Sequence, residues 1–259
     1  MAIPIKSPGE IEAMRAAGLV LRRVIAEVVA SCKPGVTTRD LDGVAANAIE
    51  QAGAAPVFLH YTRGDAPPFP NVSCICVNEE VVHSVPGDRI IRNGDLVTVD
   101  IALRYPARAG WCVDGATTLV VANGGAMAER LRNTAVLALD AAVAATGPGV
   151  LWCEVSARVC AMVHSHGLEV LGSYCGHGIG MDLHEPPRLC FGPQPKNQPD
   201  VVLRPGMVIT LEPIVTEGRF NLVTLDDGWT VVTGDRSWCA LEERTIAITP
   251  GGCTDLIGL

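Results

Sequence analysis

Four acidic residues stand inside or beside apolar, strand-like segments of the chain. Asp100 and Glu212 end the segments Leu-Val-Thr-Val-Asp and Val-Ile-Thr-Leu-Glu, while Asp114 and Glu243 precede runs rich in Thr, Ile and Val. Ionised carboxylates are costly to bury and raise one another's pKa, so such a group must take up protons, pair with Arg or Lys, or bind cations. A single carboxylate of this kind would more simply face solvent on a strand. Four of them favour a cation site.

A nitrogen ligand is available in the segment Tyr-Cys-Gly-His-Gly-Ile-Gly at residues 174–180. Flanking glycines let the backbone approach a site closely and leave the imidazole of His177 free to project. One imidazole with four carboxylates is an oxygen-rich set that suits two divalent ions better than a structural zinc. A Cys–His nucleophilic hydrolase built on Cys175 and His177 is an alternative, although the surrounding carboxylates fit that chemistry badly.

A repeat indicates how these residues are positioned. The segment Pro34-Gly35-Val36 recurs as Pro148-Gly149-Val150. Each copy leads into a helix-like stretch, and these stretches end at Gly53 and Gly167, which differ by the same offset of 114 positions. Glycine at such a position is typical of the left-handed residue just beyond a helix.

The helices and strands around the repeat also correspond. Residues 7–10 form a capping box with proline at the first helical position and open a helix to about Ser31. Residues 126–145 form the corresponding later helix. The segments 92–100 and 204–212 both begin with a turn glycine and run into a β-branched strand that ends in a carboxylate. We therefore expect one catalytic domain, residues 1–259, made of two pseudo-symmetric halves of about 1–122 and 123–259.

Composition excludes several classes of protein. The 259 residues are 48% apolar and 19% charged, which is too apolar for a disordered chain. Acidic residues number 28 against 20 Lys and Arg, giving a net charge of −8, so nucleic acid and anionic membranes are not expected partners. The first residues show no signal peptide, and no apolar run could span a bilayer. We expect a soluble, cytoplasmic protein whose ten cysteines are mostly small, free, buried side chains.

The motifs, taken in order, resemble methionine aminopeptidase type I of the M24 metallopeptidase family. The resemblance rests on Asn78 to His83, Asp100, Asp114, residues 174–180, His184 to Pro187, residues 205–213, Asp227 to Trp229, and Glu243 to Thr245. It implies the α+β "pita-bread" fold, in which a curved antiparallel sheet is covered by two helix pairs. The insertion of type II enzymes and the extra N-terminal domain of prolidases are not seen.

The resemblance also implies the metal ligands and the cofactor. Asp100 would hold one divalent ion, His177 and Glu212 the other, and Asp114 and Glu243 would bridge the two. The ions would be Co, Mn, Fe or Zn, acting on the scissile carbonyl and on a shared water.

The implied activity is removal of the N-terminal methionine from nascent proteins and peptides with a small second residue. Glu212 would take the proton of the attacking water, His184 would hydrogen-bond the scissile carbonyl oxygen, and His83 would contact the substrate backbone. Alternatively, both histidines only orient metal ligands. The expected partners are peptide or nascent-chain N-termini, the expected state is a monomer, and the acidic net charge does not support docking to a ribosome.

The methionine side chain requires an apolar pocket. By resemblance its residues are Tyr61, Phe69 and Trp229, each of which could equally be ordinary core. Residues 62–68 look like an insertion in the loop that forms this pocket. The hairpin between Asp100 and Asp114 is also longer than usual, and we expect its tip to lie over or beside the site.

Two rival functions remain. A related dimetal dipeptidase or X-Pro aminopeptidase would share the ligands, although its usual extra domain is not seen. A catalytically inactive pita-bread binding protein is a rival of another class, but such proteins typically lose ligands, and all five candidates are present. Either Glu242 or Glu243 could be proposed as ligand, and the spacing to Thr245 selects Glu243.

Overall fold

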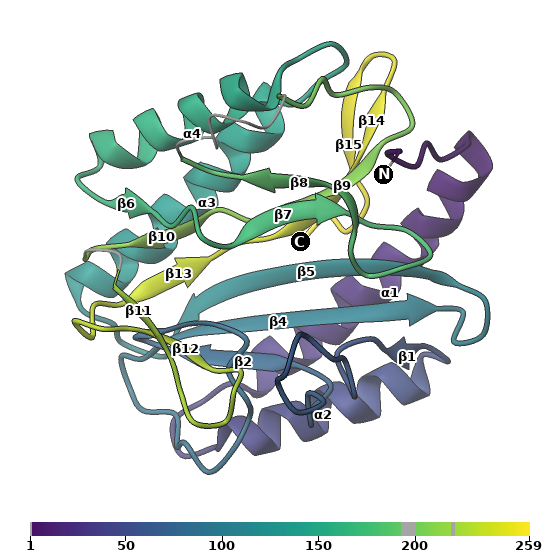
Figure 1. Cartoon of the computed structure of the whole chain (residues 1–259). Helices are drawn as coiled ribbons and strands as arrows, with labels where there is room; N and C mark the ends of the chain where they lie inside the picture. The colour runs from purple at the N-terminus through teal and green to yellow at the C-terminus, as the bar shows by residue number, and fades with distance from the viewer. Residues whose placement is uncertain (1, 193–199, 219–220) are drawn as a thin grey trace.

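Two pairs of helices lie on opposite sides of a set of strands in a computed structural model that describes residues 2–192, 200–218 and 221–259 (Figure 1). In the first pair α1 packs against α2, and in the second α3 packs against α4. Their bounds are Pro8–Ser31 for α1, Thr38–Gln51 for α2, Ala126–Ala145 for α3 and Trp152–Ser165 for α4.

The helix ends follow the sequence signals closely. Ser7 caps α1, and Glu10 completes the capping box with its carboxylate on the backbone N–H of Ser7, at 2.7 Å. Gly53 and Gly167 follow the C-caps of α2 and α4 with φ of +68° and +65°, a left-handed conformation that costs other residues energy. The predicted capping box and the two terminal glycines are confirmed.

The strands pair antiparallel at every described pairing. Three sheets contain, in order, β1-β4-β2 with β5 beside β4, then β13-β10-β6, then β11-β12-β3, and a fourth contains β15-β14-β9-β7-β8. Strands β1 to β5 span Ala55–Pro56, Cys74–Val77, Glu80–Val82, Leu96–Tyr105 and Trp111–Val120. Strands β6 to β10 span Glu169–Val170, Cys175–Gly178, Glu185–Cys190, Val208–Leu211 and Ile214–Thr216. Strands β11 to β15 span Leu222–Thr224, Val231–Thr233, Cys239–Leu241, Arg244–Thr249 and Gly252–Asp255.

The two predicted strand segments begin with turns. A turn that places Asp95 N–H on the carbonyl of Arg92 precedes β4, and one that places Met207 N–H on the carbonyl of Arg204 precedes β9. β4 includes Asp100, whereas Glu212 lies one residue past the end of β9. The expectation that each strand ends in a carboxylate therefore holds for β9, which stops just before Glu212, and is wrong for β4, which continues past Asp100 to Tyr105.

Apolar residues fill the space between each helix pair and the strands. Leu21 and Ile25 of α1 pack with Val99 of β4, and Leu131 of α3 packs with Ile209 of β9. Each is almost fully buried, and burial of one such side chain stabilises the fold by about 1.5–3 kcal/mol. These contacts fix the positions of β4 and β9 against the helices, and with them the positions of Asp100 and Glu212.

The tip of the long β4–β5 hairpin does not line the site, although its strands carry Asp100 and Asp114. Its loop, residues 106–110, packs beside the end of α2, where Ala107 N–H donates to the carbonyl of Gly53 at 3.1 Å. None of these loop residues lines the central cavity. The expectation that this tip lies over or beside the site is wrong, because the tip is held against Gly53, just past the end of α2.

Among the described residues, no helix combines the length and the apolar composition that a bilayer crossing requires.

Candidate metal centre

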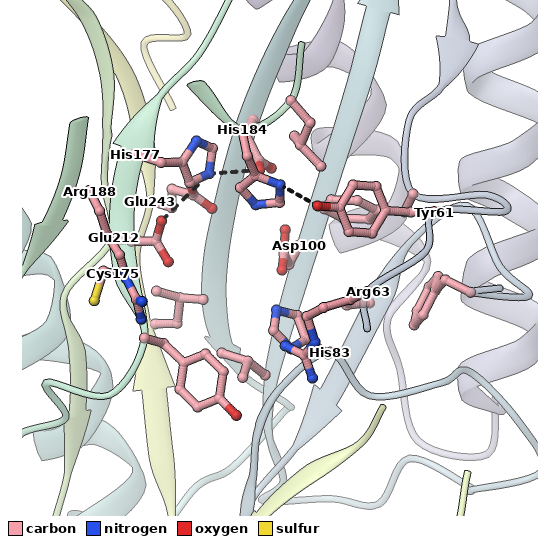
Figure 2. A pocket seen from close by; sticks show the side chains of 18 of the residues that line it. Tyr61, Arg63, His83, Asp100, Cys175, His177, His184, Arg188, Glu212 and Glu243 are labelled. Carbon is pink, nitrogen blue, oxygen red and sulfur yellow. Dashed lines mark hydrogen bonds and ion pairs between the residues drawn. The ribbon is translucent and has the colours of Figure 1, made fainter. Parts of the chain in front are cut away.

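Five side chains from within or just beyond separate strands converge on one cavity of about 600 Å³: Asp100, Asp114, His177, Glu212 and Glu243. The Nε2 atom of His177 lies 4.0 Å from Oδ2 of Asp114 and 3.9 Å from Oε1 of Glu212 (Figure 2). Donor atoms of Asp114, His177 and Glu243 all lie within 4.8 Å of one another. The structure thus brings together all five candidate ligands that the resemblance indicates.

The pairing of β4 with β5 places the two aspartates. Asp100 is paired with Ala116, and Asp114 is paired with Ala102, so the two acidic residues are diagonal neighbours on one face. Thr245 of β14 fixes Asp114 further, because its hydroxyl donates to the carbonyl of Asp114 at 2.7 Å and accepts the N–H of Asp114 at 3.0 Å. The β-branched strands therefore determine the spacing of these two carboxylates.

Glu243 occupies the junction between β13 and β14. It forms an isolated bridge with Ala116, whose carbonyl accepts the Glu243 N–H at 2.9 Å. Its neighbour Glu242 has a different environment and accepts the N–H of Thr118 at 3.0 Å, with Arg244 at 3.6 Å. Adjacent glutamates thus have separate roles: Glu243 faces the cavity and Glu242 joins two strands.

His177 is held in one tautomer by its own strand. Its Nδ1 lies 2.9 Å from the carbonyl of Gly178, an acceptor, so the proton is on Nδ1 and the lone pair of Nε2 faces the carboxylates. A Cβ at Gly176 would overlap the carbonyl oxygen of Thr210, and one at Gly178 would overlap that of Pro186. Burial, and secondarily His184, lower the pKa of His177 to about 3, so the imidazole is neutral.

Nearby arginines only partly compensate the acidic cluster: Arg188 lowers the pKa of Glu212 and Arg244 that of Glu243, but neither offsets the effect of burial. Burial raises the pKa of all four carboxyls, to about 7 for Asp114 and about 8 for Glu212, and nearby carboxylates add to the rise for Asp100, Glu212 and Glu243. One oxygen each of Asp100, Asp114 and Glu243 is buried with no hydrogen-bond partner among the described residues. Orphaned carboxylate oxygens beside a neutral imidazole nitrogen are what divalent ions bind, so the residues fit the implied metals.

Two further histidines, His83 and His184, face the cavity. The Tyr61 hydroxyl lies 2.8 Å from Nδ1 of His184, whose ring centre is 4.3 Å from that of His177. Arg63 Nη1 lies 3.4 Å from Nδ1 of His83, and since a guanidinium only donates, Nδ1 accepts and Nε2 carries the proton. Burial, followed by Arg63, lowers the pKa of His83 to about 4 and lowers that of His184.

Aromatic rings form the apolar wall of the cavity. Phe69 and Trp229 are 2% and 3% exposed and meet edge to face with ring centres 5.3 Å apart. The ring centre of Tyr61 lies 6.4 Å from that of Trp229 and 5.4 Å from that of His184. The three predicted pocket residues are therefore brought together, and Phe58 and Cys74 line the cavity beside them. The residue types of Phe58 and Cys74 do not distinguish them from ordinary core residues, so the sequence did not indicate their place in the cavity.

The cysteine predictions need correction. Cys175 and Cys190 form a disulfide between β7 and β8, beside His177. Cys175 therefore has no free thiol, and the Cys–His nucleophile hypothesis is wrong. Sequence scanning missed this bond because the two cysteines are 15 residues apart and meet only through strand pairing. Of the free cysteines, five are buried as expected, namely Cys32, Cys74, Cys76, Cys112 and Cys239.

Comparison with known proteins agrees with this architecture. The chain is 36% identical to the methionine aminopeptidase of Escherichia coli (strain K12) over 98% of this chain and 93% of that protein, and 36% identical to methionine aminopeptidase 1 of Bacillus subtilis (strain 168) over 95% and 96%. A crystal structure of the methionine aminopeptidase from Thermotoga maritima superposes with a TM-score of 0.91, at 34% identity and 99% coverage of both chains.

A more distant likeness shows the fold alone. The prolidase from Pyrococcus furiosus matches with a TM-score of 0.76 at 23% identity, over 98% of this chain and 65% of that one. The two solved structures confirm the predicted pita-bread fold, and the bacterial relatives confirm the resemblance to methionine aminopeptidases. The model of metallopeptidase family M24 matches residues 12–250. On this match and on the near full-length identity with the two bacterial enzymes, the chain belongs to metallopeptidase family M24.

Proposed function

We propose that this protein is a metal-dependent methionine aminopeptidase, which removes the N-terminal methionine from peptides and nascent proteins with a small second residue. The observation that carries the proposal is the group of buried carboxylates and His177 at the edge of an aromatic-walled cavity. The acidic cluster suits divalent ions and a substrate amine, and the apolar wall suits a methionine side chain.

Five residues would hold the ions. These are Asp100, Asp114, His177, Glu212 and Glu243, in the roles that the resemblance implies. Two divalent ions, when bound, would polarise the scissile carbonyl and lower the pKa of a water. All five donor residues line the one cavity, which is more than a single ion requires and supports two ions. Their identity among Co, Mn, Fe and Zn is part of the test.

The chain's own side chains supply the proton transfers and orientation. Glu212 accepts a hydrogen bond from Thr210 on Oε1 at 3.0 Å, which leaves Oε2 to take the proton of the attacking water. If the Tyr61 hydroxyl donates to Nδ1 of His184, the Nε2–H of His184 can donate to the carbonyl oxygen as negative charge develops there. His83, with its proton on Nε2, can donate to the substrate backbone.

Small second residues are expected because the space beyond the metal centre is shared by side chains. His83, Tyr174 and His184 line the same cavity as the carboxylates, with the ring centres of His83 and Tyr174 5.4 Å apart. A large second side chain would have to displace one of these. We expect a cytoplasmic monomer that acts on peptide and nascent-chain N-termini, in line with the sequence predictions.

The test is an add-back assay. The purified protein is stripped with a chelator and assayed on Met-Ala, Met-Leu and Ala-Pro peptides after addition of Co²⁺, Mn²⁺, Fe²⁺ or Zn²⁺. Turnover of Met-Ala well above Met-Leu, with none of Ala-Pro, supports the proposal. Preferential cleavage of Ala-Pro would instead indicate the X-Pro aminopeptidase, and no turnover with any metal would indicate an inactive binding protein.

A further inference from the structure

An arginine from the inserted loop lines the substrate cavity. Arg63 belongs to residues 62–68, and its guanidinium lies over the ring of Trp229, 5.2 Å from the centroid. Figure 2 shows Arg63 beside His83, with Arg188 at the opposite side of the view. Stacking on an indole face is a favourable position for a guanidinium, because the negative face of the ring attracts the cation. The cation is thus held at the rim of the apolar pocket.

The inserted loop itself is attached to the pocket. Trp229 Nε1 donates to the carbonyl of Pro67 at 2.7 Å, and Phe69 N–H donates to the carbonyl of Tyr61 at 2.8 Å. Arg63 therefore stacks on the same indole that hydrogen-bonds its own loop. This arrangement fixes the guanidinium relative to the site, and a surface loop without such contacts would not.

Arg63 has no carboxylate partner in the part of the chain that the structure describes. It takes part in none of the ion pairs there. Arg188, the other arginine of the cavity, faces Glu212 and lowers the pKa of that carboxyl, and it donates to the carbonyl of Ser173 at 3.3 Å. The charge of Arg188 is thus partly balanced at the metal centre, and that of Arg63 is available to a ligand.

The signs of charge orient a bound peptide. The acidic centre attracts the peptide's amino group, and the aromatic wall takes its first side chain. A cation at the rim repels the amine and attracts a negative group further along the peptide. Residue 3 lies about 7 Å beyond residue 1 in an extended chain, so its side chain is the first that can leave the crowded centre and reach the rim.

We propose that Arg63 binds a carboxylate on the far side of the scissile bond, so that this enzyme prefers methionyl peptides with an acidic third residue or a nearby free C-terminus. The proposal rests on the proposed function, because it assumes that a peptide N-terminus occupies the cavity. The recognised chemistry is a single carboxylate, and the side chain and the C-terminus are its two possible sources.

Binding to the metal-free protein tests the proposal without turnover. Calorimetric titration compares Met-Ala-Asp-amide with its isosteric neutral analogue Met-Ala-Asn-amide, and Met-Ala-Ala free acid with Met-Ala-Ala-amide. We expect the acidic member of at least one pair to bind about three- to fivefold more tightly at low salt, and less so at 0.5 M NaCl, as for an exposed ion pair. Whichever pair shows the gain identifies the source of the carboxylate.

Three variants assign the gain to Arg63. Arg63→Gln should abolish it, and Arg63→Lys, which keeps the charge but loses the planar group, should retain part of it. Arg39→Gln is the matched control, since Arg39 is an exposed arginine paired with Asp88 at 3.0 Å outside the cavity, and it should leave the gain unchanged. The proposal would be overturned by any of three results: equal binding within both pairs, no binding of any peptide, or a gain in affinity that survives Arg63→Gln.

Kinetics separate this proposal from the proposed function. With metal added, the ratio of kcat/KM between the Asp and Asn peptides should fall to about one in Arg63→Gln, while cleavage of the Asn peptide continues. If no methionyl peptide is cleaved by the wild type but the Arg63-dependent binding preference is present, the proposed function fails and the carboxylate site stands.

Discussion

The hydroxyl of Tyr61 lies 2.8 Å from Nδ1 of His184, although 123 residues separate them in the chain. Tyr61 comes from the pocket loop and His184 from the segment just before β8. The resemblance indicated Tyr61 as a wall of the methionine pocket, and the structure adds a polar contact with the histidine assigned to the carbonyl oxygen. One side chain therefore links the pocket to the reaction centre.

Tyr61→Phe tests that link. The ring remains in the wall, so KM for Met-Ala peptides should change little, whereas kcat should fall about 3- to 10-fold because one hydrogen bond that orients His184 is lost. Steady-state kinetics measure both constants. Tyr105→Phe, at the far end of the β4–β5 hairpin, is the control and should leave both unchanged. A rise in KM alone would show that Tyr61 acts only as pocket wall.

Replacing His177 with Ala should weaken metal binding and activity together. Loss of a direct nitrogen donor is expected to cost more than the roughly 10- to 100-fold that loss of a ligand's hydrogen-bond partner costs. Calorimetric titration with Mn²⁺ and the Met-Ala assay provide the two measurements. The exposed His164, paired with Glu169 at 3.0 Å, gives the matched control His164→Ala. Unchanged Mn²⁺ affinity in His177→Ala would contradict the ligand assignment.

Glu243→Gln should have opposite effects on the metal-free and the metal-loaded protein. Neutralising one of four crowded carboxyls relieves repulsion and raises Tm without metal. The same change should reduce the rise in Tm on metal addition, which for the wild type corresponds to about 2.7 kcal/mol when the metal is at 100 times its Kd.

The adjacent Glu242→Gln is the control for this pair of measurements. Glu242 lies 3.6 Å from Arg244 and bonds to Thr118, so the neutral variant should lower Tm in both states and leave the metal-induced rise intact. If the two variants behaved alike, the separate roles that the structure gives these adjacent glutamates would be wrong.

Stability of the metal-free protein should fall as pH rises from about 5 to 8. The pKa of Asp114 is raised from 3.8 to about 7 and that of Glu212 from 4.5 to about 8, chiefly by burial. A carboxyl whose pKa is higher in the folded state contributes stability that is fully present below its ordinary pKa and is lost as pH rises through the folded value.

Urea unfolding midpoints at half-unit pH intervals measure this dependence. Excess Mn²⁺ should flatten or reverse the trend, because ions bind the deprotonated carboxylates. Glu243→Gln should show a shallower slope than the wild type without metal. A metal-free midpoint that climbs steadily over this window would contradict the acidic cluster as the dominant titrating group.

The Cys175–Cys190 disulfide should stabilise the fold without supplying chemistry. It spans 15 residues, and a cross-link of that length contributes about 3 kcal/mol in the chain-entropy account. Cys175→Ser should therefore lower the free energy of unfolding by up to about 3 kcal/mol under oxidising conditions, measured in urea, while Met-Ala turnover at 25 °C persists. Cys153→Ser, at an exposed free cysteine, is the control. Complete loss of turnover in a folded Cys175→Ser would revive a catalytic thiol.

Local signals in the sequence were enough to predict the helices. Ser7 and Glu10 make the capping box of α1 from side chains three residues apart, and Gly53 and Gly167 end helices through their own backbone conformation. The buried carboxylates were also visible, because Asp100 stands within an apolar strand where a charge has no structural reason to be. Such features depend on residues that are close in the chain.

Relationships between distant segments could not be read in the same way. The disulfide between Cys175 and Cys190 needs the register of β7 with β8, and the contact of Tyr61 with His184 needs the fold of the pocket loop. The direction of the β4–β5 hairpin tip was wrong for the same reason, since only the contact with Gly53 determines it. The resemblance identified the candidate ligands, whereas only the folded structure shows which side chains contact them.

The two glycines beside His177 have a consequence for attempts to redesign this enzyme. Because a Cβ at Gly176 or Gly178 would overlap a carbonyl oxygen of a neighbouring strand or turn, a randomised library at these positions should return glycine almost alone among folded clones. Diversity intended to retune substrate choice is better placed at the exposed positions of residues 62–68, but not at Gly64, whose φ of +54° strains any other side chain. The scaffold thus separates a part that must stay fixed from a part that can be varied.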